Sequence, residues 1–193
     1  NHLTGGISDT GNYGRNGIAS TGSLTISGGS TVTANGGNGG NVSGDGISSN
    51  GSVTISGGTV KAAGGDSKDG YGGDGIRSDG GVTISGNTVN AAGGSGGKVG
   101  GYGICSFDRV AISGGTVTAN GGDGSSGGDG IRSGDIDLSG SLELTAKAGS
   151  PNGKALSQRG NELDLDDIKD KLGPGAKVTA TDANGETKQV SIP

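Results

Sequence analysis

Residues 72–87 read GGDGIRSDGGVTISGN, and residues 44–58 read GDGISSNGSVTISGG, which is nearly the same sequence one step earlier in the chain. The Ile that follows the Gly recurs with successive spacings of 29, 29, 28, 27 and 25 residues, at Ile18, Ile47, Ile76, Ile104, Ile131 and, more loosely, Leu156. A fixed period in this range is typical of a solenoid of stacked coils. We therefore expect one structural unit to repeat along the chain.

Each unit carries three short apolar runs, which in the third unit contain Ile76, Ile84 and Val89. Because successive side chains of a strand face opposite sides, one alternating set should point inward. The predicted inward sets are Ile47, Ser49, Val53, Ile55, Val60 and Ala62; Ile76, Ser78, Val82, Ile84, Val89 and Ala91; and Ile104, Ser106, Val110, Ile112, Val117 and Ala119. The pattern predicts an all-β parallel β-helix with three short strands in each coil of roughly 28 residues.

The composition agrees with strands separated by glycine turns. The chain has 193 residues, of which 49 are Gly, and it is 27% hydrophobic and 2% aromatic. Glycine disfavours helices because its backbone loses much conformational freedom there. Such a composition is often disordered, but here the apolar residues cluster at a fixed period, which indicates ordered strands.

Two domains are expected, a β-helix over residues 1–160 and a C-terminal cap over residues 161–193. The cap should contain a short helix, because LDLDDIKDKLG places Leu165, Ile168 and Leu172 at helical spacing. A hairpin should follow around Asn184 and Gly185. At the other end, residues 3–7 (LTGGI) match the end of a preceding coil.

The net charge and the cysteine content limit the classes of partner and the location that are expected for the chain. A net charge of −5 argues against nucleic acid and anionic membranes as partners, and no apolar run is long enough to insert into a bilayer. The single Cys excludes an internal disulfide, and a Cys-poor chain rich in Gly, Ser, Thr and Asn is common among bacterial surface proteins. We expect a secreted or cell-surface bacterial protein, either a monomer or one domain of a longer chain.

Acidic residues recur in the glycine-rich loops before each Gly-Ile pair. Ca²⁺ binds about six to eight oxygens, which carboxylates and free carbonyls of a loop supply. The predicted metal ligands are Asp45, Asp66, Asp69, Asp74, Asp123 and Asp129, with the loop of Asp66, Asp69 and Asp74 as the best candidate. Two alternatives stay open: an Asp before Gly commonly bonds the local backbone of a turn, and such loops drift where nothing selects against change.

Carbohydrate binding is the second candidate chemistry. Tyr13 and Tyr71 each lie three residues before the slot of Asn16 and Asp74, and Tyr102 fills that slot in the fourth coil. All three rings should therefore gather at one edge, where they offer platforms for sugar faces. The predicted carbohydrate-binding residues are Tyr13, Tyr71, Tyr102, Arg77 and Arg132. The alternative is that the rings merely pack over exposed turns.

Catalysis and ice binding have weaker support. The one His, His2, lies close to the start of the sequence, so His-based acid–base chemistry is not expected. Arg77 and Arg132 lie in the same column two coils apart, with Cys105 between them. An arginine flanked by acidic loops is typical of calcium-dependent β-helix polysaccharide lyases, but no Asp cluster projects from a strand here as those enzymes require. Cys105 should be a partly exposed, inert thiol. An outward threonine array on the third strands invites an ice-binding interpretation, but Lys61 and Asn90 break its second column. Good strand propensity explains the exposed threonines better.

The runs GDGISSNGSVTISGG, GDGIRSDGGVTISGN and GDGIRSGDIDLSG resemble the repeat of the secreted clostridial carbohydrate-binding β-helix family, within the pectate-lyase-like superfamily. TISGGTVTANGG-like runs are also similar to those of Gly-rich surface proteins of gut Firmicutes. The resemblance covers about residues 7–156 and implies a right-handed parallel β-helix, Ca²⁺ in acidic loops, and binding of plant polysaccharides such as cellulose or pectin without established cleavage. The family's acidic slot falls on Asp45, Asp74 and Asp129, whereas Tyr102 departs from it.

Together these observations predict a non-catalytic carbohydrate-binding or adhesion module that binds a plant-type or host polysaccharide, with possible structural Ca²⁺. The alternative from another class is a structural stalk that spaces other domains. A calcium-dependent polysaccharide lyase is the third and least supported candidate.

Overall fold

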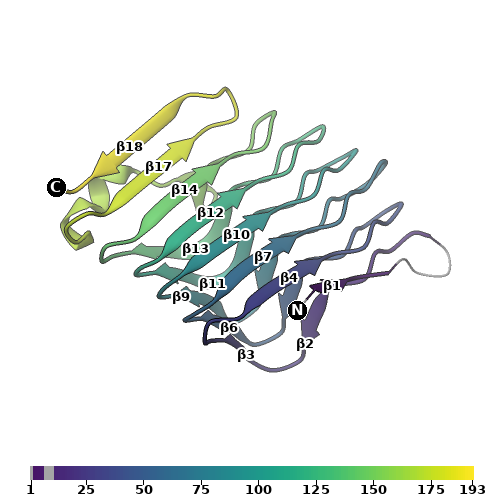
Figure 1. Cartoon of the computed structure of the whole chain (residues 1–193). Helices are drawn as coiled ribbons and strands as arrows, with labels where there is room; N and C mark the ends of the chain where they lie inside the picture. Colours follow the sequence, from purple (N-terminus) through teal and green to yellow (C-terminus); the bar gives the residue numbers. More distant parts are fainter. Residues whose placement is uncertain (1, 7–10) are drawn as a thin grey trace.

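The computed structural model describes residues 2–6 and 11–193. The chain forms an all-β, right-handed parallel β-helix of about five turns, as predicted. Figure 1 shows the coils stacked in chain order, from the purple N-terminal coil to the yellow C-terminal end. Strands of successive coils pair in parallel, so each coil is hydrogen-bonded to the coils before and after it.

Three strand positions recur in each coil. The first position holds β2 (Ile18–Ser20), β5 (Ile47–Ser49), β8 (Ile76–Ser78) and β15 (Leu156–Gln158). The second holds β3 (Leu24–Ile26), β6 (Ser52–Ile55) and β9 (Gly81–Ile84). The third holds β4 (Thr31–Asn35), β7 (Thr59–Ala63), β10 (Thr88–Ala92), β12 (Thr116–Asn120), β14 (Glu143–Lys147) and β17 (Lys177–Thr181). In two coils one long strand occupies both the first and second positions, namely β11 (Ile104–Ile112) and β13 (Ile131–Leu138).

The interior is filled by the side chains that the alternation predicts. All three predicted inward sets are buried, including their serines. The first-strand register aligns Ile47, Ile76, Ile104, Ile131 and Leu156 in one column along the stack. Each coil therefore buries its apolar residues against its neighbours, which is why the repeats stabilise one another.

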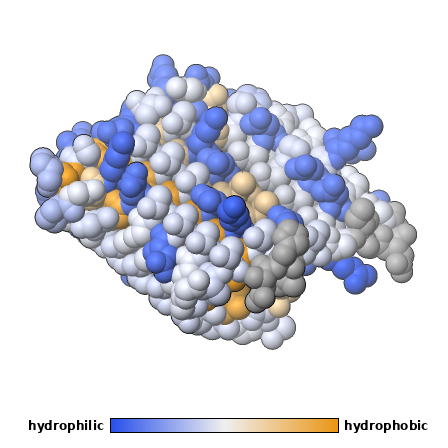
Figure 2. Space-filling view, viewed as in Figure 1, coloured by the Kyte–Doolittle hydropathy of each residue, from blue (hydrophilic) through white to orange (hydrophobic). Residues whose placement is uncertain are grey.

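The outward face of the third strands is polar and regular. Thr31, Thr59, Thr88 and Thr116 stand in register in one column. In the neighbouring column Lys61 and Asn90 interrupt the threonines, as the sequence indicated. Figure 2 shows blue hydrophilic side chains spread over the face seen in that view, rather than gathered in one patch.

The two ends of the stack differ. At the N-terminal end β1 (His2–Thr4) pairs with β4 in parallel, which places residues 2–4 in a preceding coil; Ile7, the last residue of the predicted match, lies outside the described residues. At the C-terminal end β17 pairs with β14 in parallel and in register, so the last coil includes residues beyond 160. β18 (Thr187–Ser191) then covers β17 as the second strand of the predicted hairpin, with Gly185 in its turn at φ +85°.

The predicted cap helix is corrected by the structure. Residues 163–172 form two 3-10 helices, η1 (Leu165–Asp167) and η2 (Lys169–Lys171), rather than one α-helix. They follow a two-residue strand, β16 (Asn161–Glu162), which pairs antiparallel with β15. The residues chosen for helical spacing, Leu165, Ile168 and Leu172, are nevertheless buried and join the core. Within the described residues, no helix is long and apolar enough to cross a membrane.

Candidate functional site

The glycine-rich loops form a continuous hydrogen-bonded layer, called here the glycine wall. Figure 1 shows the loops side by side beyond the third strands. The N–H of Gly65 donates to the carbonyl of Gly44, and the N–H of Gly73 donates to the carbonyl of Gly65, both at 2.9 Å. Each glycine of the series bonds the one before it in the same way, through Gly37, Gly44, Gly65, Gly73, Gly94, Gly101, Gly122, Gly128 and Gly149.

Close approach of backbones explains why these positions are glycine. A Cβ atom on Gly73 would lie 1.9 Å from the carbonyl oxygen of Gly44, and one on Gly101 would lie 1.8 Å from that of Gly73. These contacts are with backbone of the neighbouring coil, which cannot rotate away as a side chain could. The alternative that the loops drift without constraint is therefore wrong for the glycine wall.

The acidic slot before each Gly-Ile pair forms a ladder along the stack, called here the slot ladder. The Oδ1 atom of Asn16 accepts the backbone N–H of Asp45, that of Asp45 accepts the N–H of Asp74, and that of Asp74 accepts the N–H of Tyr102, each at 2.8 Å. Tyr102 interrupts the series. The Oδ1 atom of Asp129 then accepts the N–H of Lys154 at 2.8 Å.

A second, more exposed ladder lies in the loops. The N–H of Asp66 donates to the Oδ1 atom of Asn38, and the Oδ1 atom of Asp66 accepts the N–H of Ser95, both at 2.9 Å. Asp123 accepts the N–H of Ser150 in the same way. In both ladders the side chain bonds the next coil and not its own turn, so the local-turn alternative is also corrected. These hydrogen bonds account for the recurrence of Asp without a ligand.

The structure does not gather the predicted calcium ligands at one point. Among residues 2–6 and 11–193, no three His, Cys, Asp or Glu side chains lie close enough together to hold a metal ion. Asp66 belongs to the loop ladder and Asp74 to the slot ladder, whereas Asp69 is exposed. Calcium binding therefore stays a prediction, with Asp45 and Asp74 as its best remaining pair.

Two carboxylates of the slot ladder are stacked in a poorly solvated place. Asp74 is only 5% exposed. Burial, together with the neighbouring charge of Asp45, raises the pKa of the Asp74 carboxyl to about 7, although the hydrogen bond from the Tyr102 N–H and the charge of Arg77 act to lower it. Burial also raises the pKa of Asp45 above its ordinary value. The Oδ2 atom of Asp74 lies 3.7 Å from Nη1 of Arg77, so the pair is partly compensated.

Beside the slot ladder runs a groove of about 560 Å³, called here the Tyr71 groove. Its lining comes from four successive coils and includes Asn16, Val42, Asp45, Tyr71, Asp74, Arg77 and Tyr102. One wall contains Val42, Tyr71 and Val99, which belong to a column of single β-bridges that begins at Tyr13. Tyr71 is 48% exposed there, so its ring is available to a ligand. The groove thus runs along the stack and combines an aromatic surface with one buried carboxylate, Asp74, and one half-buried carboxylate, Asp45.

The five predicted carbohydrate-binding residues are divided by the structure. Tyr71, Tyr102 and Arg77 line the Tyr71 groove, and Tyr13 lies in the same bridged column without lining it. Arg132 lies one step away, where its Nη1 atom donates to the Tyr102 hydroxyl at 2.8 Å. The predicted gathering of aromatic side chains at one edge is confirmed in this arrangement.

Cys105 and Phe107 lie beyond the groove on the same face. The register places Cys105 between Arg77 and Arg132, as predicted, but its side chain is buried rather than partly exposed. Burial, with the nearby charge of Asp74, raises the pKa of the Cys105 thiol to about 12, which disfavours the reactive thiolate form. Phe107 is 61% exposed and lies under the guanidinium of Arg77, 4.9 Å from ring centre to Cζ.

Sequence reasoning did not single out Phe107 as a site residue. A register shift in the β11–β13 pair between Ser106 and Arg109 accompanies its exposed position. The sequence did contain a signal for it. Aromatic residues make up only 2% of the chain, and an alternation that points Ser106 inward points the Phe107 ring outward.

Comparison with known families identifies the repeat. A family model described as a beta helix repeat matches residues 53–76 and 110–129, which lie within the second to the fifth coil. Comparisons with curated proteins and with solved structures gave no match. The matched segments and the solenoid architecture together support the assignment of a β-helix repeat. This fold is consistent with a structural or binding module in general.

Proposed function

We propose that this chain is a non-catalytic carbohydrate-binding module of a secreted or cell-surface bacterial protein, and that a polysaccharide lies in the Tyr71 groove. The observation that carries the proposal is the direction of the groove, which runs across four coils along the axis of the stack. Four coils at a spacing of about 4.8 Å span roughly 14 Å between the first and the last, which is room for a few sugar units of a linear polymer.

The groove offers the groups that sugars need. Sugar rings have an apolar face that packs on aromatic rings and a rim of hydroxyls that donate and accept hydrogen bonds. Tyr71 supplies the exposed ring, and the carboxylates of Asp45 and Asp74 supply acceptors at the base of the slot. Arg77 and the Tyr102 hydroxyl supply donors. Concave sites of this kind, with few well-placed polar groups, are where ligands usually bind.

Glycan-array screening followed by calorimetry with the best polysaccharide tests the proposal. We expect Tyr71→Ala to weaken binding about tenfold or more, because a central aromatic contact in an interface commonly contributes more than about 1.4 kcal/mol. Asn90→Ala, which truncates an exposed side chain on the third-strand face, serves as the control and should bind like the wild type. Equal binding by Tyr71→Ala and the wild type would place the glycan elsewhere.

A structural stalk is the second candidate, and the hydrogen-bonded stacking of both strands and loops favours it. A stalk should retain no glycan on the array. Release of unsaturated oligosaccharide from pectin would instead indicate a lyase, the enzymatic alternative.

A further inference from the structure

The N-terminal end of the stack is an open coil-to-coil interface (Figure 1). In the described part of the chain, β2 pairs only with β5 and β3 pairs only with β6, so each of these strands has one edge without a partner strand. The third strand of this coil, β4, is covered by β1. In a strand that is paired on one side, alternate N–H and C=O groups face the open edge. The first coil therefore presents the kind of surface that every later coil uses to bind its neighbour.

The apolar side chains at this end are less buried than their equivalents one coil further along. Ile18, Leu24 and Val32 are half-buried and pack on the core from one side. The residues that pair with them in register are each 0% exposed, namely Ile47, Val53 and Val60. Because the later residues have a coil on both sides, covering the N-terminal end would bury further apolar surface and stabilise the complex that covers it.

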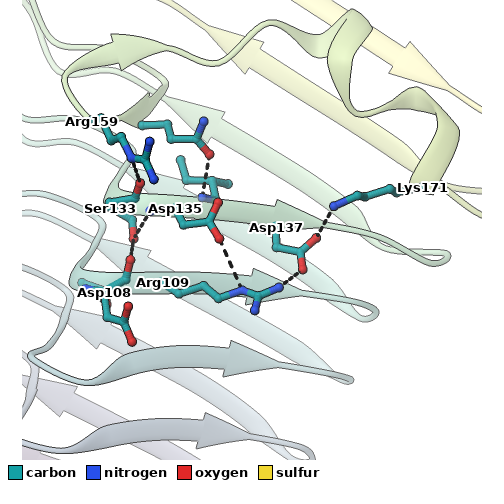
Figure 3. Close-up of polar contacts among 11 residues, drawn as sticks. Asp108, Arg109, Ser133, Asp135, Asp137, Arg159 and Lys171 are labelled. Carbon is teal, nitrogen blue, oxygen red and sulfur yellow. Dashed lines mark hydrogen bonds and ion pairs between the residues drawn. The ribbon is translucent and has the colours of Figure 1, made fainter.

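The opposite end of the stack is closed. β18 pairs antiparallel with β17, and apolar side chains of residues 163–172 join the core there. Figure 3 shows how this cap is fixed to the last coils: Nζ of Lys171 lies 3.4 Å from Oδ1 of Asp137 in β13, and the same carboxylate pairs with Arg109. A second copy that docked here would have to displace the cap. Head-to-tail stacking of copies into a fibre is therefore blocked at this end.

Charge also distinguishes the two ends. Residues 11–36, which form β2 to β4 and the turns around them, contain one charged residue, Arg15, and no Pro. Residues 161–193 contain seven acidic and four basic residues. Charges or Pro on an open edge strand commonly keep a second copy away, and β2 and β3 have neither. The nearly neutral first coil lets two identical surfaces meet without strong repulsion, although the net charge of the chain is −5.

We propose that two copies of this chain associate end to end through their N-terminal coils. A two-fold axis between the copies brings the same surface of each into contact and makes the edge strands of one copy antiparallel to those of the other. β1 stands one layer above β2 and β3, so the β1 strands of the two copies fit side by side, each over open strands of the other. Because both C-terminal ends stay closed, the association stops at a dimer. The proposal does not depend on the carbohydrate-binding function.

Analytical ultracentrifugation of the chain from about 1 to about 200 μM tests this proposal, and the wild type should show a monomer–dimer equilibrium without larger species. Leu24→Lys should raise the dimer dissociation constant at least about hundredfold, because the charge lies at the solvated end of the monomer but is buried in the dimer. Thr25→Lys, at an exposed position of β3 where the fold is not at risk, should raise it about fivefold through repulsion of like charges. Thr145→Lys makes the same change on β14 and should dimerise like the wild type. Circular dichroism checks that each variant is folded.

Hydrogen exchange of the wild type locates the contact. The amides of β2 and β3 should exchange more slowly at a concentration where the dimer forms than at one where the protein is monomeric, whereas those of β18 should not change. Three results would overturn the proposal. They are a wild type that stays monomeric over the whole concentration range, a dimer that folded Leu24→Lys and Thr25→Lys leave unchanged, and species that grow beyond the dimer as the concentration rises.

Discussion

Each coil has a strand half and a loop half, which stack at the same spacing by different means. In the strand half, side chains such as Ile76 and Ile84 fill the interior. In the loop half, the glycine wall packs backbone against backbone and bonds each coil to the next. The slot ladder lies at the junction, where the carboxylate of Asp74 caps a backbone N–H of the following coil.

The difference teaches where the fold tolerates change. A buried side chain can be shortened, and its neighbours then relax partly into the space. A backbone contact of the glycine wall has no such freedom, because both partners are fixed by the strands that flank them. The loop half, which by composition looks permissive, is therefore expected to be the less tolerant half.

The largest effect is expected at Gly73, where Gly73→Ala sets a Cβ against the Gly44 carbonyl. We expect a loss of about 4 kcal/mol or more, at the upper end of the cost of overpacking, and a fall in melting temperature of roughly 10 °C. Ile76→Ala, three residues away in the strand half, should cost about 2–4 kcal/mol. Gly29→Ala is the matched control, since its Cβ meets no atom within 4 Å. If Gly73→Ala lowered the free energy of unfolding less than Ile76→Ala, the strand half and not the loop half would be the less tolerant of change.

The strand half was predictable because side-chain alternation reports directly on burial. Ile76, Ser78 and Val82 were assigned inward from period two alone, and the structure confirms them. The glycine wall was not predictable, since hydrogen bonds between glycine backbones leave no side-chain pattern beyond the glycine itself. The sequence likewise showed that Asp74 recurs, but its partner is the backbone of Tyr102, 28 residues further along.

The second-largest effect is expected from the charge of Asp74, which lies in the slot ladder at the junction of the strand half and the loop half. Because the pKa of Asp74 is raised to about 7 in the folded state, the folded protein binds this proton more tightly than the unfolded chain does. The free energy of unfolding should therefore fall as pH rises from about 4 to about 7, and level off above. Asp74→Asn keeps an Oδ1 acceptor, as Asn16 does in the first coil, and removes the charge.

We expect Asp74→Asn to stabilise the protein at pH 8, by up to about 3 kcal/mol, and to flatten this pH dependence. Urea denaturation between pH 4 and pH 8 measures both quantities. Asp123→Asn, at the exposed ladder, is the control and should leave the pH profile unchanged, since Asp123 is exposed and bonds Ser150 at the surface. Destabilisation of Asp74→Asn at pH 8 would show that the negative charge itself holds the junction together.

The smallest effect is expected from added calcium. Its addition tests whether the loop half binds a ligand that the strand half does not need. Asp45 and Asp74 are adjacent carboxylates beside an open groove, so a divalent cation there would relieve their repulsion. Two carboxylates supply only part of the oxygens that Ca²⁺ needs, which implies millimolar affinity and water as the remaining ligand. At 10 mM CaCl₂ we expect about 1 kcal/mol of stabilisation, lost with chelator and absent in Asp74→Asn. An unchanged melting temperature in calcium would mean that hydrogen bonds to backbone are the whole reason for the slot ladder.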